Sequence, residues 1–202
     1  MNLAVVVSIL ALLAHLPGAA GYSGQQDPPT QEEMMLAYME TMAPGEAHER
    51  LAGLAGSWTI SNKMWMEPGQ EAMLTSGTCE NEMILGGRFL TSKCAGGEGE
   101  MYVENLFIIG FDRRWNQYTF VGYDTMGTYF VTAAGEYDPE TRTITMYGED
   151  EDPVLGFTQQ YDIVMRWVSE DEYVTEVIFK DDVHTGGEGP FKVVEVVSTR
   201  VR

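Results

Sequence analysis

Residues 56–94 constrain the fold most, because they alternate in polarity as antiparallel strands do. From Trp58 to Glu67 every second residue is apolar, with Asn62 the exception, and the residues between them are polar apart from Trp65. A period of two indicates a strand with one buried face and one solvent-facing side. Such strands are typical of antiparallel or closed sheets, whereas the strands of parallel sheets are apolar on both faces.

The next two strands place the two cysteines of the chain opposite each other. If Gly86 and Gly87 form a two-residue turn, the partners across the hairpin have numbers that add up to 173, and Cys79 and Cys94 are such a pair. Cα atoms of cross-strand partners lie roughly 4.5 to 5.5 Å apart, which a disulfide tolerates. The sequence therefore predicts a disulfide, and the alternative is two reduced thiols that serve as small apolar residues.

The rest of the chain repeats the strand pattern with short turns between strands. Residues 157–167 alternate most clearly, and no segment has the length of the crossover helix that parallel strands need. We therefore predict a mainly β fold: a single antiparallel up-and-down barrel of about eight to ten strands with one or two short N-terminal helices. The first helix begins at Thr30, which forms a capping box with Glu33.

Methionines and a tyrosine share one face of this first helix, at Met35, Tyr38, Met39 and Met42. We expect this face to pack against the barrel, because methionine commonly fills gaps in cores. The alternative is a flexible binding surface.

The first 21 residues differ from the rest. The apolar run from Leu3 to Leu16 is shorter than a typical transmembrane helix, and a helix breaker and small residues follow it. We predict a signal peptide at residues 1–21, a linker at 22–30, and one domain of helices and barrel at 31–202. Since residues 1–21 contain no Lys or Arg, a short membrane anchor is the alternative.

Net charge and cysteine use limit the partners and the compartment. The formal charge is −19, and all of it lies beyond the predicted signal peptide. Such a charge disfavours nucleic acid and anionic membrane surfaces as partners. A disulfide persists where the medium is oxidising, so we predict an exported protein, periplasmic or extracellular, with no membrane span after cleavage.

Several motifs together resemble a known family. Gly56-Ser57-Trp58 resembles the G-x-W signature of lipocalin-like, or calycin, barrels, in which an Arg of the last strand packs across the barrel base onto that Trp. This resemblance implies that Arg200 packs on Trp58. Combined with the motifs that follow, it makes the chain similar to a bacterial family known only as domain of unknown function 1579, which implies a lipocalin-like barrel and no assigned activity. The motifs are KMWMEPG (63–69), ENEMILGGRFL (80–90), GFD (110–112), YDTMGT (123–128) and STR (198–200).

No motif predicts a catalytic residue, a metal site or a cofactor. His48 and His184 have no metal-ligand partner at helical or strand spacing, so we expect both on the surface. The acidic run Glu149–Asp152 is expected in a solvated loop, with a calcium site as the alternative, because it lacks the ligand order and the glycine of an EF-hand loop.

The barrel interior is the predicted binding site, for one small and mostly apolar ligand. Two alternatives remain: a filled barrel that acts as an interaction or structural protein, with Trp65 and Trp115 exposed for a dimer, or an enzyme that uses carboxylates such as Asp124 and Glu104. The sequence does not decide the oligomeric state. By alternation, the residues that line the interior are Met64, Met66, Phe107, Ile109, Phe120, Tyr161 and Met165.

Overall fold

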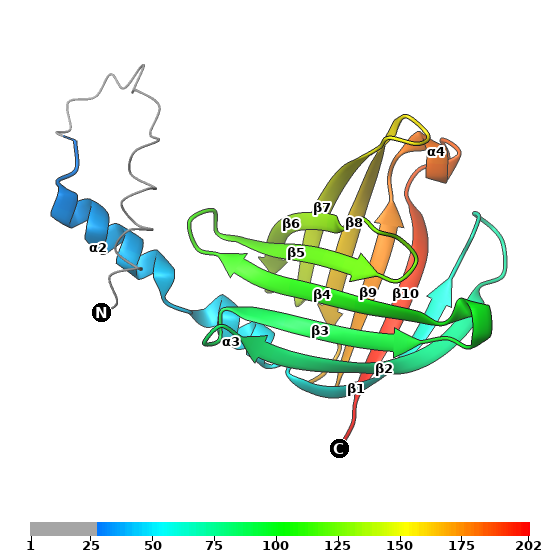
Figure 1. Cartoon of the computed structure of the whole chain (residues 1–202), viewed down its shortest axis with the longest axis horizontal. Helices are drawn as coiled ribbons and strands as arrows, with labels where there is room; N and C mark the ends of the chain where they lie inside the picture. Colours follow the sequence, from blue (N-terminus) through cyan, green and yellow to red (C-terminus); the bar gives the residue numbers. More distant parts are fainter. Residues whose placement is uncertain (1–27) are drawn as a thin grey trace. The chain divides into compact units, whose positions relative to one another are not determined.

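The computed structural model describes residues 28–202 (Figure 1). The predicted signal peptide and all but the last three residues of the predicted linker lie outside the described residues. Contacts divide the chain into two units, with the boundary in the sequence between Leu36 and Ala37. The barrel belongs wholly to the second unit.

The first described helix, α2, spans Gln31–Met42 and begins as predicted. The backbone N–H of Thr30 donates to Glu33 Oε2 at 2.7 Å, and the N–H of Glu33 donates to Thr30 Oγ1 at 3.2 Å, so the capping box is confirmed. No side chain of α2 is buried, and the packing of its methionine face against the barrel stays a prediction. Among the described residues no helix has the length and apolar character of a membrane span.

Ten antiparallel strands close into one barrel, as predicted (Figure 1). Each strand pairs with its neighbours in sequence, and β1 pairs with β10 to complete the circle. The strands are β1 (Gly56–Met64), β2 (Met73–Ile84), β3 (Phe89–Gly96), β4 (Val103–Asp112), β5 (Gln117–Asp124), β6 (Val131–Asp138), β7 (Thr143–Asp152), β8 (Phe157–Trp167), β9 (Glu172–Phe179) and β10 (Phe191–Arg200). Three short helices accompany them: α3 (Glu46–Ala52), the 3₁₀ helix η1 (Gly99–Met101) and α4 (Asp182–Thr185).

The hairpin of β2 and β3 has the predicted register but a different turn. Cys79 pairs with Cys94, their Cα atoms are 4.0 Å apart, and the predicted disulfide is confirmed. The last pair of the ladder is Ile84 with Phe89, so four residues rather than two connect the strands. Both registers share the same sum of residue numbers, which is why the cysteine pairing survives the error in the turn.

The acidic run before β8 is part of a strand, so the predicted loop is wrong. Glu149–Asp152 forms the end of β7 and pairs with residues 157–160 of β8. The alternation fits a strand, because Glu149 and Glu151 are exposed while Asp150 and Asp152 are half-buried. Pairing with β8 therefore overrides the preference of charged residues for loops.

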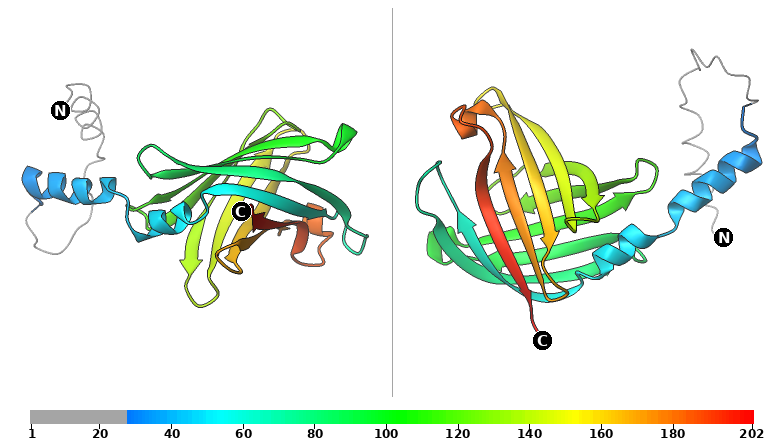
Figure 2. Two further views of the ribbon diagram at one scale, coloured as in Figure 1. Left: turned by 90° about the horizontal axis from the view of Figure 1, so that it is seen from below. Right: turned by 180° about the vertical axis from the view of Figure 1, so that it is seen from behind.

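Strands β1 and β10 lie side by side where the barrel closes (Figure 2), and ion pairs occupy the outer face of this seam. Lys63 and Glu195 are direct partners in the ladder, with Lys63 Nζ 2.9 Å from Glu195 Oε1. Lys192 contacts the same carboxylate and also Glu176 of β9, at 2.7 Å. The hydrogen bonds from both lysines hold the pKa of Glu195 at about 2, far below its ordinary value, although partial burial opposes this. Opposite charges directly across a ladder favour this register.

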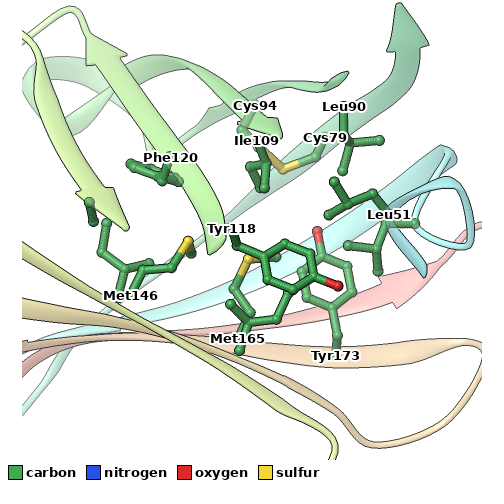
Figure 3. Close-up of a cluster of buried hydrophobic side chains, with 14 of the residues drawn as sticks. Leu51, Cys79, Leu90, Cys94, Ile109, Tyr118, Phe120, Met146, Met165 and Tyr173 are labelled. Atoms are coloured by element: carbon green, nitrogen blue, oxygen red, sulfur yellow. A yellow bond between two sulfur atoms is a disulfide. The ribbon is translucent and has the colours of Figure 1, made fainter. Parts of the chain in front are cut away.

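Helix α3 plugs one end of the barrel. Leu51 and Leu54 are buried in the barrel core, and α3 packs against β2, β3 and β4. Figure 3 shows this buried cluster, in which Leu51 of α3 lies with Tyr118, Tyr173 and side chains from most strands. We call this end of the barrel the α3 end. Because β10 starts just after α4 and finishes beside α3, helix α4 marks the opposite end, which we call the mouth.

Candidate functional site

Polar groups at the α3 end bind the carbonyl groups that follow α3. The indole N–H of Trp58 and the amide of Asn81 both donate to the carbonyl oxygen of Leu54, at 2.9 and 3.0 Å. Arg200 donates to the carbonyl oxygens of Gly53 and Ala55, at 2.6 and 2.8 Å. These bonds fix the plug at this end of the barrel.

Solvent exposure of the inward side chains increases from the α3 end toward the mouth on three adjacent strands. On β1 the inward side chains change from Trp58, 1% exposed, to half-buried Ile60 and Met64. On β10 they change from buried Ser198 to half-buried Val196, and β9 behaves in the same way beyond Tyr173. The inward side chains of β7 and β8 near the centre are buried instead. The lumen, meaning the interior of the barrel, is therefore filled at the α3 end and along β7 and β8, and solvent reaches it along β9, β10 and β1.

Asn62 brings an unpaired polar atom to this open side. It alternates with exposed Ser61 and Lys63, so it faces inward, and its Nδ2 donates to Thr75 Oγ1 of β2 at 3.1 Å. Its Oδ1 is buried and has no hydrogen-bond partner within residues 28–202. Since Thr75 is its one polar partner there, one end of the amide stays free whichever way the amide is turned.

The predicted lining residues occupy different depths. Ile109, Phe120, Tyr161 and Met165 are all at most 7% exposed and belong to the packed core. Phe107 and Met64 are half-buried, Phe107 against this core and Met64 at the mouth end of β1. Met66 lies beyond β1 and is 64% exposed, so the barrel wall does not turn it inward. Alternation alone does not show where a strand ends or which inward side chains solvent reaches.

Tyr161 and Asp150 form a polar pair near the mouth. The hydroxyl of Tyr161 lies 2.6 Å from Asp150 Oδ2 and 3.0 Å from the carbonyl oxygen of Thr132. The shorter contact, to the charged oxygen, is the stronger hydrogen bond. Burial raises the pKa of Tyr161, and the neighbouring carboxylate raises it further. This hydroxyl therefore stays protonated and acts as a donor.

Asp181 and His184 form a second pair at the mouth, which the sequence reasoning missed. Asp181 is buried and caps α4 by accepting the N–H of His184 at 2.9 Å, and its carboxylate lies 3.0 Å from His184 Nδ1. Burial opposes ionisation of Asp181, but the hydrogen bonds from His184 and from the N–H of Gln160 outweigh it and lower its pKa. The imidazole stacks on Phe179 with ring centres 3.9 Å apart. The spacing Asp-x-x-His at the start of a short helix is the signal that could have revealed this pair.

The ring of His184 is hydrogen-bonded on one side. Asp181 fixes one nitrogen of His184, and the other nitrogen has no hydrogen-bond partner in the described part of the chain. No serine, threonine or cysteine among residues 28–202 bonds to that ring as a nucleophile would. Asp124 and Glu104, the predicted carboxylates, are both exposed, and Asp124 accepts the N–H groups of its own turn.

The two tryptophans predicted to be exposed for a dimer differ in their exposure to solvent. Trp115 is 74% exposed, while Trp65 is half-buried with Lys192 5.6 Å from its ring centre. No group of three or more possible metal ligands occurs among the residues that the structure describes.

Comparisons with known proteins identify a family and no activity. A family model described as "Protein of unknown function (DUF1579)" matches residues 43–200. No curated protein matches the chain. Among solved structures the chain is similar to a redesigned beta barrel, with 11% sequence identity, a TM-score of 0.38, and coverage of 75% of this chain and 95% of the other.

Proposed function

Because the chain belongs to the family of proteins of unknown function DUF1579, whose description assigns no activity, we propose a function from the geometry of its own barrel. The protein binds one small, mostly apolar molecule that carries a single hydroxyl or N–H group, in the open side of the lumen. It binds this molecule without chemical conversion. The observation that carries the proposal is the buried Oδ1 of Asn62, which has no hydrogen-bond partner among residues 28–202 and lies among half-buried apolar side chains.

The apolar part of the ligand replaces water along β9, β10 and β1. Ile60, Val177 and Val196 face inward there and keep contact with solvent. Burial of apolar surface contributes about 25 cal/mol per Å², so a ligand that covers these side chains gains affinity from each of them. A filled interior would leave no such surface, and this difference favours a binding protein over a purely structural barrel.

The polar group of the ligand pairs with Asn62. A buried amide atom without a partner costs roughly 1–3 kcal/mol, and a ligand hydroxyl that bonds to it removes this cost. A hydroxyl suits either orientation of the amide, since it can both donate and accept.

Fluorescence of N-phenyl-1-naphthylamine, an apolar probe with one N–H group, tests binding in the lumen. We expect a saturable rise with the wild-type protein. Ile60→Trp fills the inward position and is expected to weaken binding by at least about tenfold, whereas Thr59→Trp, on the exposed face of the same strand, is expected to change it less than about twofold. Absence of a saturable rise, or equal effects of the two variants, would refute the lumen as the site.

Competition tests the role of Asn62. We expect 1-decanol to displace the probe roughly fivefold better than 1-chlorodecane, which lacks the hydroxyl, because one neutral hydrogen bond is worth about 1 kcal/mol. Asn62→Leu is expected to remove this preference, and Ser61→Leu is the matched control on the exposed face. A preference that persists in Asn62→Leu would exclude this residue as the polar partner.

We also propose that the protein acts outside the cytoplasm. The apolar run within residues 1–21 and the Cys79–Cys94 disulfide support this. The mass of the protein recovered from the exported fraction is expected to correspond to a chain that begins at Tyr22 and has lost two protons relative to its reduced form. A mass that retains residues 1–21 would indicate a membrane anchor instead.

A further inference from the structure

A pocket of about 350 Å³ lies at the α3 end of the barrel, away from the mouth. It is formed by α3, the end of β4, the turn between β4 and β5, the start of β5, and β6. We propose that this pocket binds a small aromatic carboxylate. The side chains that carry the argument are His48, Arg50, Phe111, Arg113, Tyr118 and Tyr137.

His48 supplies a hydrogen-bond donor that has no partner. The side chain is 6% exposed, and its Nδ1 accepts the backbone N–H of Gly45 at 3.1 Å. Burial lowers the pKa of His48, and the charges of Arg113 and Arg88 lower it further, so the ring is neutral at pH 7 and carries its proton on Nε2. Within residues 28–202 no acceptor bonds to this Nε2–H, and His48 is one of the residues that line the pocket.

Tyr118 supplies a second donor. It is 1% exposed, and its hydroxyl oxygen accepts a hydrogen bond from Arg50 at 2.6 Å. Burial raises the pKa of Tyr118, so the hydroxyl keeps its proton. Because the oxygen accepts from Arg50, the hydroxyl proton is available to an acceptor in the pocket.

The charges around the pocket favour an anion although the whole chain is strongly acidic. Arg113 donates to the carbonyl oxygens of Glu40 and Ala43, and Arg88 donates to that of Met42, so these bonds leave the charge of both arginines uncancelled. Neither arginine takes part in an ion pair among the described residues. Glu46 also lines the pocket, where Arg50 pairs with it at 2.8 Å.

One more acidic side chain, Glu136, lines the pocket and is exposed to solvent. Arg113 and Arg88 are exposed as well, so water screens all three of these charges. The lowered pKa of His48 is consistent with a positive potential at the pocket.

Aromatic rings form the remaining wall and favour a flat ligand. Phe111 packs edge-on against Tyr118, with ring centres 4.9 Å apart, and His48 packs edge-on against Phe111 at 6.0 Å. The guanidinium of Arg50 lies 3.8 Å from the ring centre of Tyr137. A planar ring fits between such groups, while its carboxylate accepts from His48, Tyr118 and Arg113.

Titration of the folded full chain with benzoate tests the proposal, with the imidazole signals of His48 followed by NMR. We expect saturable shifts with a Kd on the order of 1 mM, which is reasonable for a ligand of this size. The pKa of His48 is expected to rise when benzoate binds, because a nearby carboxylate favours the charged ring. Benzyl alcohol and inorganic phosphate, which lack the carboxylate or the ring, are expected to shift these signals at least about tenfold less at equal concentration.

Two pairs of variants separate the loss of a hydrogen-bond donor or charge from a general effect on folding. His48→Asn keeps an acceptor for the N–H of Gly45 and removes the Nε2 donor, whereas His48→Gln keeps a donor near that position and loses the acceptor. We expect benzoate affinity to fall by about fivefold to tenfold in the first and by less than about twofold in the second. Arg113→Met is expected to weaken binding at least about tenfold, and Arg114→Met, next to it but paired with Asp112, less than about twofold.

Three results would overturn the proposal. The first is that benzoate leaves the His48 signals of the folded wild-type chain unchanged at 20-fold above the expected Kd, about 20 mM. The second is an equal response to phosphate, and the third is unchanged affinity in folded Arg113→Met. The measurement on the wild-type chain does not depend on whether any variant folds. Since the lumen probe is expected to bind along β9, β10 and β1, and none of these strands lines this pocket, its result and that of the benzoate titration are independent.

Discussion

The guanidinium carbon of Arg200 lies 4.2 Å from the centre of the Trp58 ring, so a side chain of the last strand covers the buried tryptophan of the first strand. The same guanidinium binds the carbonyl groups of Gly53 and Ala55, which follow α3. One side chain therefore connects barrel closure with the plug. A planar fork of donors meets two carbonyl oxygens and an aromatic face at once, which the ammonium of lysine cannot do.

Replacement of Arg200 is expected to destabilise the barrel. Arg200→Ala loses the stacking on Trp58 and the hydrogen bonds to the carbonyl oxygens of Gly53, Ala55 and Glu170, so we expect the free energy of unfolding to fall by about 2–3 kcal/mol. Arg200→Lys is expected to recover less than half of this loss. Urea unfolding measures the stability of both variants. Arg202→Ala is the control, because the side chain of Arg202 is 83% exposed. A lysine variant as stable as the wild type would show that charge alone is sufficient.

Reduction of the disulfide is expected to destabilise the barrel as well. Cys79 and Cys94 close a loop with a sequence separation of 15, for which the chain-entropy model gives about 3 kcal/mol. We expect a reductant to lower the melting temperature by roughly 6–12 °C for a domain of this size. The double variant Cys79→Ala/Cys94→Ala is expected to melt at the same temperature with and without reductant. Equal melting of the reduced and oxidised wild type would contradict a stabilising bridge.

Acid is expected to weaken the seam between β1 and β10 through Glu195. The folded pKa of Glu195 is about 2, below the ordinary carboxyl value, so its contribution to stability is complete above about pH 4.5 and is lost as the pH falls toward 2. Lys63 is 46% exposed, so we reduce the expected contribution to about 1 kcal/mol. Unfolding of Glu195→Gln and wild type between pH 7 and 2 measures it. The two stabilities are expected to converge near pH 2, and a constant difference across this range would assign the effect to packing.

The sequence predicts the barrel well because its signals are local. Alternation along each strand shows which side chains share a face, and the register between Cys79 and Cys94 follows from one hairpin. The depth of each inward residue depends on strands far apart in sequence. Ile60 and Ile109 share an apolar pattern, but the first is half-buried and the second is 3% exposed.

The two polar sites at the ends of the barrel differ in how much of them a local pattern can reveal. His48, Arg113 and Tyr118 come from three segments that meet only after the barrel closes around α3. Asp181 and His184 are close in sequence, and their spacing predicts a helix cap. The position of the imidazole at the mouth also depends on Phe179, on which it stacks. The acidic end of β7 is a strand and not the predicted loop, because pairing with β8, which a local pattern does not show, decides its conformation.

Alkaline pH is expected to reveal the buried hydroxyl of Tyr161. Burial and the Asp150 carboxylate raise its pKa above the ordinary value of about 10, so the folded state keeps a proton that the unfolded state releases. The stability that this group contributes is present below pH 10 and is lost as the pH rises further, at about 1 kcal/mol per pH unit.

Urea unfolding of wild type and Tyr161→Phe between pH 9 and 12 tests this expectation. Tyr161→Phe also leaves the partly buried Asp150 without its donor, so we expect it to be less stable by about 1–2 kcal/mol at pH 7 and to lose stability less steeply above pH 10. Tyr147→Phe is the matched control, because Tyr147 also donates to a carboxylate but is 44% exposed. Its stability is expected to follow the wild type within about 0.5 kcal/mol. Equal alkaline slopes for wild type and Tyr161→Phe would mean that the mouth admits enough water to solvate the phenolate, and the lumen would then be more open at β8 than the burial of Tyr161 indicates.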